Sequence, residues 1–348
     1  MTDEQYMRRA IELAKRGMGY TSPNPMVGAV IVKDGRIIGE GWHERYGELH
    51  AERNALKHCK ESPQGADMYV TLEPCCHHGK QPPCVEAVIE AGIKKVYVGS
   101  DDPNPLVAGG GIKILKEHGI EVVTQVLKDE CDRLNDVFFY FIQTRRPYVA
   151  MKYAMTMDGK IATYSGLSKW ITGEAARENV HMDRHRYSAI MVGINTVLKD
   201  DPMLNCRSKA IENPHQPVRI VCDTKLRIPY DSNLVKTAGQ IPVWIVTCCH
   251  DKERINMYEK AGCEIIAMEG EKIDIAQLMI ILGRREIDSC ICEGGAELNW
   301  SVIKSGMVKR IQAYIAPKIF GGVDAPVSVA GVGFDAPDDA LKLKDYTV

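Results

Sequence analysis

The chain has 348 residues, of which 45% are hydrophobic and 26% are charged, and its formal net charge is -2. This length suggests two domains of an ordinary globular protein, and the small charge gives no general drive toward nucleic acid or an anionic membrane. No run approaches about 18 uninterrupted apolar residues, and no hydrophobic stretch follows the acidic N-terminus, so we expect neither a membrane span nor a signal peptide. The twelve cysteines then indicate reduced thiols and predict a cytoplasmic location.

The first half alternates between predicted helices and strands. An amphipathic helix is expected over 3–17, and a β-hairpin over 26–41 with its turn at Asp34-Gly35. Apolar periodicity then predicts helices over 50–59, 82–92, 109–119 and 129–143, and strands over 68–72, 95–99 and 120–126. One hairpin followed by alternating helix and strand predicts an α/β/α sandwich.

The polar segment 144–147 is the expected boundary, which gives domains at 1–145 and 146–348. The second half has predicted strands at 148–155, 189–192, 218–222, 243–247, 264–267, 289–292 and 311–315, with helices at 173–187, 251–261, 273–284 and 295–305. This βαβ rhythm predicts a mostly parallel sheet that is covered on both faces.

A histidine, two cysteines and a carboxylate form the most specific chemical pattern in the first half. His50 and Glu52 are followed by Pro74-Cys75 and then by Cys84. Zinc prefers nitrogen and sulfur ligands, and a catalytic zinc site keeps three protein ligands and leaves a fourth position for water. We therefore predict that His50, Cys75 and Cys84 bind Zn²⁺, and that Glu52 moves protons during a deamination.

The gap between the two cysteines leaves alternatives for the third ligand. The second thiolate of this pattern usually follows the first after two residues, whereas here Cys76, His77 and His78 lie between Cys75 and Cys84 and are competing ligands. We prefer Cys84 because it follows two prolines and opens an apolar helix, whose N-terminal dipole favours a thiolate. A closed structural zinc site with a fourth protein ligand is the alternative.

Glycines after a strand are the main signal for a nucleotide in the second half. No G-x-G-x-x-G follows a strand there, which argues against a standard dinucleotide-binding domain. Strand 289–292 instead runs into Glu293-Gly294-Gly295, and paired glycines at a helix start let backbone N–H groups approach a pyrophosphate. The same glycines could form only a turn. Lys152, in an apolar strand, needs a carboxylate partner or a ligand, and we expect Glu293 to be the partner.

Several longer motifs make the chain resemble a known family over essentially its full length. The segment 74–84 closely resembles the zinc loop of the bifunctional riboflavin-biosynthesis deaminases/reductases. Similar motifs are Pro23-Asn24-Pro25, Asp102-Pro103-Asn104-Pro105, Lys169-Trp170-Ile171-Thr172, Asp201-Pro202, Glu293-Gly294-Gly295 and Ala316-Pro317-Lys318. The resemblance implies a cytidine-deaminase-like α/β/α sandwich followed by a dihydrofolate-reductase-like domain.

The resemblance implies two successive reactions with Zn²⁺ and NADPH as cofactors. The first domain would deaminate 2,5-diamino-6-ribosylamino-4(3H)-pyrimidinone 5′-phosphate. The second would reduce the ribosyl side chain to give 5-amino-6-ribitylamino-uracil 5′-phosphate. A homo-oligomer acting on a small phosphorylated pyrimidine is expected. Family members usually carry a further closing β-segment after the region matching Leu341–Val348, and its absence could weaken the second domain or leave a sheet edge open.

The same resemblance implies the residues that contact each ligand. Contacts to the deaminase substrate would come from Asn24, His43, His77, Lys80, Asp102 and Asn104. Contacts to NADPH would come from Ala154, Trp170, Thr196, Asp200, Thr224, Gly294 and Gly295. The reductase substrate would meet Lys152, Ser168, Arg184, Leu204, Arg207 and Glu293, with both arginines suited to a phosphate by their bidentate geometry.

Plainer readings of these residues remain open. Lys80 could be a solvated loop lysine, Asn24 a turn former, and Trp170 a core side chain. Arg184 could lie on the exposed face of a basic helix. Two rival functions share part of the chemistry: a nucleic-acid adenosine deaminase, and a deaminase whose second domain only binds a ligand.

Overall fold

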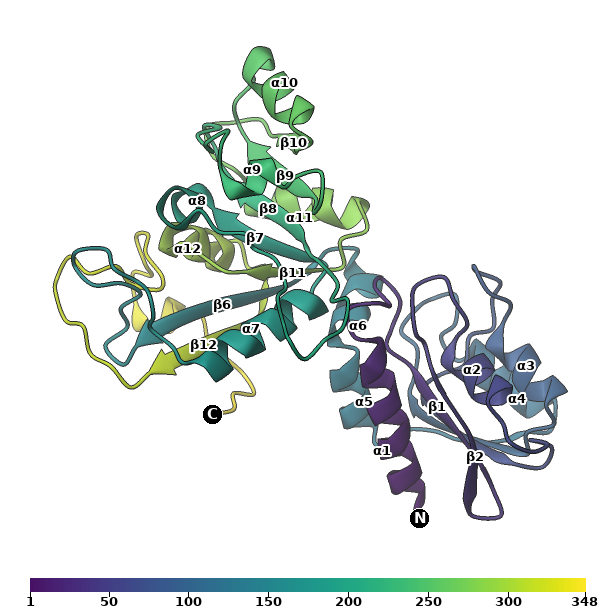
Figure 1. The fold of residues 1–348 in the computed structure, drawn as a ribbon. Helices are drawn as coiled ribbons and strands as arrows, with labels where there is room; N and C mark the ends of the chain where they lie inside the picture. The colour runs from purple at the N-terminus through teal and green to yellow at the C-terminus, as the bar shows by residue number, and fades with distance from the viewer. The chain divides into compact units, whose positions relative to one another are not determined.

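The computed structural model describes residues 1–348, which divide into two compact units, Met1–Arg145 and Arg146–Val348 (Figure 1). Each unit is built around its own β-sheet. No helix in the structure combines the length and the apolar character that a bilayer crossing requires.

The sheet of the first unit has five strands in the order β2-β1-β3-β4-β5. Their bounds are β1 Gly28–Lys33, β2 Arg36–Trp42, β3 Asp67–Leu72, β4 Lys95–Ser100 and β5 Glu121–Val123. β1 pairs antiparallel with β2 and β3, whereas β3, β4 and β5 run parallel. Asp34 and Gly35 both have positive φ (51° and 73°), as a two-residue turn between twisted strands requires.

Helices cover both faces of this sheet. On one face, α1 (Asp3–Ala14) and α5 (Lys128–Leu134) pack through Met7, Ala10 and Cys131 against inward side chains such as Val30 and Tyr69. On the other face lie α2 (Ala51–Lys57), α3 (Cys84–Glu90) and α4 (Gly110–Glu117). Because alternate residues of a strand point to opposite faces, each strand feeds both cores, and the result is the predicted α/β/α sandwich.

The single helix expected over 129–143 is wrong, because the chain breaks at Asn135 into α5 and α6 (Asp136–Thr144). Asn135 is 2% exposed, and its side chain pairs with the main chain of Met26: Oδ1 accepts from the Met26 N–H (2.8 Å) and Nδ2 donates to its carbonyl (2.9 Å). Satisfying these two buried groups at the entry to β1 outweighs helix continuity. Sequence periodicity carries no information about this long-range pairing.

The second unit has seven strands in the order β10-β9-β8-β7-β11-β6-β12, all of them parallel. The bounds are β6 Tyr148–Thr156, β7 Ala189–Gly193, β8 Val218–Cys222, β9 Val243–Thr247, β10 Glu264–Ala267, β11 Ser289–Cys292 and β12 Val308–Ala316. Predicted helices are found as α7 Glu174–Arg186, α10 Lys252–Lys260, α11 Ile275–Arg284 and α12 Ala296–Lys304. Two short helices, α8 (Ile194–Asp200) and α9 (Asn233–Lys236), were not expected from the sequence.

The close approach of α2 to the sheet depends on a glycine. A Cβ placed on Gly41 in β2 would lie 2.2 Å from the Ala55 nitrogen and 2.7 Å from the Ala51 carbonyl oxygen. Both are helix backbone atoms, which cannot move aside as a flexible side chain could. Since His50 immediately precedes α2, Gly41 sets the distance between the sheet and that end of the helix.

We therefore expect Gly41→Ala to displace α2 and destabilise the first unit by about 1–3 kcal/mol, the usual cost of overpacking. Zinc content after purification should fall as well, because His50 moves with the helix. Urea unfolding and metal analysis measure the two effects. Gly239→Ala is the control, since a Cβ there meets nothing within 4 Å. A variant with native stability and zinc content would contradict this account.

Candidate active sites

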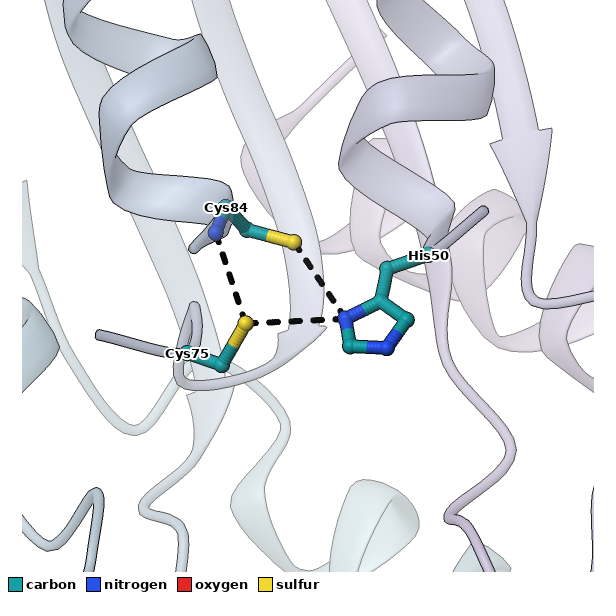
Figure 2. A group of neighbouring side chains, drawn as sticks. All are labelled: His50, Cys75 and Cys84. Carbon is teal, nitrogen blue, oxygen red and sulfur yellow. Dashed lines mark hydrogen bonds between the residues drawn. The ribbon is translucent and has the colours of Figure 1, made fainter. Parts of the chain in front are cut away.

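Two helix N-termini and a strand end bring the three predicted zinc ligands together. His50 is the residue at which α2 begins, Cys84 is the first residue of α3, and Cys75 lies on the loop after β3 (Figure 2). Helix N-termini carry partial positive charge from their free N–H groups, which favours thiolates. The Cys84 N–H donates to the Cys75 sulfur at 3.3 Å, so one of these free groups already serves the site.

The distances between the ligand atoms fit one zinc ion. His50 Nδ1 lies 3.5 Å from the Cys75 sulfur and 3.4 Å from the Cys84 sulfur. A tetrahedral ion with bonds of about 2.3 Å to sulfur and about 2.0 Å to nitrogen places neighbouring ligand atoms about 3.5 Å apart. The cluster contains these three side chains and no fourth, which is the arrangement of a catalytic site rather than a closed structural one.

The competing ligands lie elsewhere. The Cys76 sulfur points toward the carbonyls of Leu106 (3.7 Å) and Val107 (4.0 Å), away from the cluster. His77 and His78 are not part of the cluster either. The eight-residue gap therefore forms a loop that leaves the metal site at Cys75 and returns to it at Cys84.

Two further contacts hold this loop in place. Arg53 in α2 donates to the Pro83 carbonyl at 2.8 Å and so ties the end of the loop to the helix that follows His50. Glu73 is 3% exposed, and its carboxylate accepts from the N–H groups of Gly109 (3.0 Å) and Ile112 (3.1 Å) at the start of α4. The strand end that carries Cys75 is thereby fixed to a third helix N-terminus.

Glu52 lies in the first turn of α2 and is 3% exposed. It lines the same cavity of about 270 Å³ as His50 and Cys75, while Cys84 is fully buried behind them. Burial raises the pKa of Glu52 to about 6, and the nearby Cys75 charge acts in the same direction. The carboxyl group thus faces a confined space beside the ligand cluster.

All six residues expected to contact the deaminase substrate line this cavity: Asn24, His43, His77, Lys80, Asp102 and Asn104. His43 Nδ1 donates to the Leu49 carbonyl (3.1 Å), and its Nε2 accepts from Asn24 Nδ2 (3.3 Å). Its pKa falls to about 4, mainly because of burial, so the ring is neutral at pH 7. The Nδ1 atom of His77 is buried without a partner, which is unusual for a ring nitrogen unless a ligand meets it.

Asp102 and Asn104 shape their own turn as well as the cavity. Asp102 Oδ1 accepts from the Asn104 N–H (2.8 Å), and Asn104 Oδ1 accepts from the Leu106 N–H (3.1 Å). Burial raises the pKa of Asp102 to about 6, against the effect of that hydrogen bond. Asp102 and Asn104 therefore stabilise a turn and also line the cavity wall.

Tyr46 and Glu73 are among the residues of this cavity that sequence reasoning missed. The ammonium of the exposed Lys80 lies 3.8 Å from the centre of the Tyr46 ring, a cation–π contact between two residues of the cavity wall. Glu73 carried a usable signal, since a carboxylate at the end of a buried strand needs a partner. Nothing in the sequence pairs Tyr46 with Lys80.

The second unit has two adjoining cavities at the carboxyl ends of its strands, where open parallel sheets bind ligands. The first, of about 860 Å³, is lined by all six residues expected at the reductase substrate. The second, of about 540 Å³, is lined by four of those expected at NADPH, namely Thr196, Asp200, Thr224 and Gly295. Ser168 and Asp200 line both cavities, so ligands in the two would meet there.

The three other residues expected at NADPH do not line the second cavity. Ala154 and Trp170 line the first cavity, and Trp170 is 64% exposed, so the core-packing reading of this residue is wrong. Its ring lies 4.6 Å from the Arg177 guanidinium. Gly294 has φ +92°, and its carbonyl accepts from the Gly193 N–H at 2.9 Å, which joins the ends of β11 and β7.

The guanidinium of Arg184 binds a protein carboxylate and is not free for the expected phosphate. Its Nε and Nη2 atoms donate to the two carboxylate oxygens of Glu293 (2.6 and 2.8 Å), and Nη1 donates to the Asn205 carbonyl (3.1 Å). The side chain is only 13% exposed, so it is not on an exposed helix face either. Because the Glu293 carboxylate already accepts from Nε and Nη2, Arg184 cannot bind a phosphate through these two nitrogens.

The expected Lys152–Glu293 pair is also wrong, for the same reason. Arg184 occupies both oxygens of Glu293, while Lys152 makes no ion pair with it and lies 5.8 Å from the centre of the Tyr314 ring. Burial alone would raise the pKa of Glu293, but the charges and hydrogen bonds of Arg184, with a smaller effect of Lys152, lower it to about 2. The Lys152 ammonium therefore remains available to bind a ligand in the first cavity.

A three-ligand zinc cluster with a buried carboxylate, on a mixed α/β/α sandwich, defines the first unit as a zinc-dependent deaminase. Comparison with known families agrees. Residues 1–100 match the cytidine and deoxycytidylate deaminase zinc-binding region, and residues 147–348 match the RibD C-terminal domain. The predicted fold class, a cytidine-deaminase-like sandwich followed by a dihydrofolate-reductase-like domain, is confirmed.

Similar proteins match over nearly the whole chain. The riboflavin biosynthesis protein RibD of Actinobacillus pleuropneumoniae is 56% identical over 99% of this chain and 91% of its own length. The RibD of Bacillus amyloliquefaciens is 44% identical over 98% of this chain and 92% of its own. The structure of Acinetobacter baumannii RibD superposes with a TM-score of 0.87 at 39% identity, and covers 98% of this chain and 94% of that chain.

A second solved structure is from Thermotoga maritima and is described as a diaminohydroxyphosphoribosylaminopyrimidine deaminase/5-amino-6-(5-phosphoribosylamino)uracil reductase. It has a TM-score of 0.85 and 39% identity, and covers 95% of this chain and 91% of that chain. The chain belongs to the RibD family of riboflavin biosynthesis. It is a bifunctional enzyme with a zinc-binding deaminase domain and a reductase domain that uses NADPH.

The ion pair of Arg184 and Glu293 predicts a pH dependence of stability. The folded pKa of Glu293 is lowered from 4.5 to about 2, so the stabilising contribution is complete above about pH 4.5 and is lost as the pH falls toward 2. The difference in unfolding free energy between the native protein and Glu293→Gln should shrink by about 2 kcal/mol between pH 6 and pH 3. Urea unfolding at several pH values measures it.

The exposed Glu271→Gln variant is the control, because Glu271 forms no ion pair in the structure. Its difference from the native protein should stay constant over the same pH range. A constant difference for Glu293→Gln as well would show that the pair is not formed.

Proposed function

We propose that the first domain deaminates 2,5-diamino-6-ribosylamino-4(3H)-pyrimidinone 5′-phosphate, and that the second uses NADPH to reduce the ribosyl side chain of the product. The final product would be 5-amino-6-ribitylamino-uracil 5′-phosphate. The observation that carries the proposal is the single cavity lined by His50 and Cys75 of the ligand cluster together with Glu52, His77 and Lys80. Family membership supports the same substrate, which the description of the Thermotoga maritima relative names.

The residues at the metal cluster divide the work of deamination. His50, Cys75 and Cys84 would hold zinc, which when bound supplies a water activated for attack at neutral pH. Glu52 would accept the proton released by that water at its carboxylate and deliver it to the departing amino group, so that ammonia leaves. Its burial beside the cluster keeps this carboxyl away from bulk solvent, so the transferred proton is not lost.

Other residues of the cavity would bind and orient the substrate. Lys80, in contact with Tyr46, supplies a positive charge for the phosphate, and the unpartnered Nδ1 of His77 supplies a further polar contact. Asn24, fixed through its bond to His43, would contact the polar edge of the pyrimidine. Asp102 and Asn104 close the cavity on the side of β4.

In the reductase, the two adjoining cavities suit a cofactor and a substrate that react where they meet. Gly294 and Gly295 precede α12, whose N-terminal N–H groups would face the pyrophosphate of NADPH, and Thr196, Asp200 and Thr224 line the same cavity. Lys152, Ser168, Leu204 and Arg207 would contact the pyrimidine phosphate. Arg184 would act through Glu293 and Asn205.

The proposal includes the setting of the enzyme. The partners would be this small phosphorylated substrate and a second copy of the chain in a homo-oligomer, with no role for nucleic acid or membrane. A cytoplasmic location is consistent with twelve cysteines that are all free. Deamination of a nucleic acid but not of the pyrimidine phosphate would instead support the adenosine deaminase alternative.

Glu52→Gln should abolish deamination while zinc stays bound, because the amide keeps the shape of the side chain and cannot carry the proton. We expect kcat for ammonia release to fall by at least about a hundredfold. The assay contains the diaminopyrimidine phosphate, zinc and NADPH, and omission of NADPH should not affect ammonia release. Glu86→Gln, at an exposed position of α3, is the control. Intact deamination in Glu52→Gln would refute the mechanism.

Gly295→Ala should weaken NADPH binding by about tenfold, because its positive φ (+48°) disfavours a side chain and an added Cβ would lie 3.4 Å from Thr196 Oγ1. Fluorescence titration with NADPH measures the Kd. Gly306→Ala is the matched control, since Gly306 also has positive φ (+71°) but lies in open space at the end of α12. If the native protein does not bind NADPH at all, the second domain is only a ligand-binding domain.

A further inference from the structure

The loop Asp201–Arg207 forms one wall of the reductase substrate cavity. It has no regular secondary structure, yet it contributes Asp201, Pro202, Met203, Leu204 and Arg207 to that wall. Leu204 is 3% exposed and has a left-handed backbone (φ +50°), which a leucine adopts only when its surroundings enforce it. Something outside the loop must therefore hold its main chain.

Arg219 is a group that does so from the interior of the domain. It lies on β8 and is fully buried, at 0% exposure. Nη1 donates to the Met203 carbonyl at 3.2 Å, directly before Leu204, and to Thr237 Oγ1 at 2.8 Å. Nη2 donates to the carbonyls of Thr237 (3.0 Å) and Ile241 (2.5 Å).

This arginine has no carboxylate partner. All four of its hydrogen bonds end on neutral oxygens, and no ion pair involves it. Burial lowers the pKa of Arg219 to about 10, so the group still carries its charge at pH 7. Burying a charge costs free energy, and a leucine or methionine would fill the same space at a lower cost. The arginine therefore indicates that the bond from its guanidinium to the Met203 carbonyl is needed.

The same loop is held at its other residues by side chains from separate elements. Asn233 Nδ2 donates to the Asp201 carbonyl at 2.9 Å, and Arg184 Nη1 donates to the Asn205 carbonyl at 3.1 Å. Gln216 pairs with both main-chain groups of Cys206 (2.8 and 2.9 Å). Between Asp201 and Asn205, the main chain is held at the Met203 carbonyl, and Arg219 is the side chain that binds it.

We propose that Arg219 is a positioning residue for the reductase, which fixes Leu204 at the substrate cavity by holding the Met203 carbonyl. The position of this loop sets the affinity for the pyrimidine phosphate. Arg219 acts through the loop and touches neither substrate nor cofactor. The inference rests on the proposed reductase function, because it assigns the cavity lined by this loop to the pyrimidine substrate.

The test is Arg219→Lys in the full-length protein. An ammonium keeps the charge but cannot span Met203 on one side and Ile241 on the other, as the planar fork does. KM for the deaminated ribosylamino-uracil phosphate should rise by about tenfold and kcat change by less than about threefold. Kd for NADPH and the deaminase activity should stay as in the native protein. Hydrogen exchange should speed up at the amides of 201–207 and stay unchanged in β7 and β11.

Thr237→Val is the control for a merely structural role. It removes one acceptor of Nη1 but leaves the bond from Nη1 to the Met203 carbonyl, so it should lower stability without changing KM. An unchanged KM in folded Arg219→Lys overturns the proposal, and so does a rise in KM that Thr237→Val reproduces at equal loss of stability. Should Arg219→Lys not fold, Gln216→Ala releases the same loop at Cys206, and an unchanged KM there overturns the role of the loop.

The failure of the proposed function would look different. A native protein that binds NADPH but reduces no ribosylamino-uracil phosphate would refute the reductase assignment itself. A native protein that is active, with Arg219→Lys indistinguishable from it, would refute only the role of Arg219.

Discussion

Parallel pairing of strands is the constraint on which both sites depend. Parallel strands bring their carboxyl ends to one edge of a sheet, and the segments that follow them must therefore converge. In the first unit β3 leads to Glu73 and Cys75, and the parallel β4 leads to Asp102 and Asn104. In the second unit all seven strands are parallel, and the ends of β6, β7, β8 and β11 surround the two adjoining cavities.

Buried polar groups then decide how the converging segments are held. The Glu73 carboxylate caps α4, Arg184 and Glu293 satisfy each other, and Asn135 pairs with the main chain of Met26. Each arrangement removes the cost of an unpaired group in the interior, and each also fixes a loop that lines a cavity or supports one. The enzyme therefore uses the same contacts for stability and for placing its functional side chains.

Helix and strand periodicity was sufficient for most elements, because it reports which face of a segment is buried. It failed where a single long-range contact overrides the local pattern, as at Asn135, and for α8 and α9, which are too short to show a period. Among site residues, Cys84 at its helix start, and not Cys76, lies beside His50 and Cys75, where the preferred third ligand was expected. The expected partner of Glu293 was wrong, because Lys152 and Arg184 are both plausible cations and only their placement separates them.

The sequence by itself determined the candidate groups of the two sites: the possible ligands His50, Cys75 and Cys84, the carboxylate Glu52 and the paired glycines before α12. Residue types at short spacings along one strand or helix can be recognised from the sequence without knowledge of the fold. Tertiary structure decided which nitrogen of His50 faces the sulfurs, that Tyr46 contacts Lys80, and that Arg184 binds Glu293. These facts depend on side chains that meet across distant segments, and a linear pattern carries no measure of that distance.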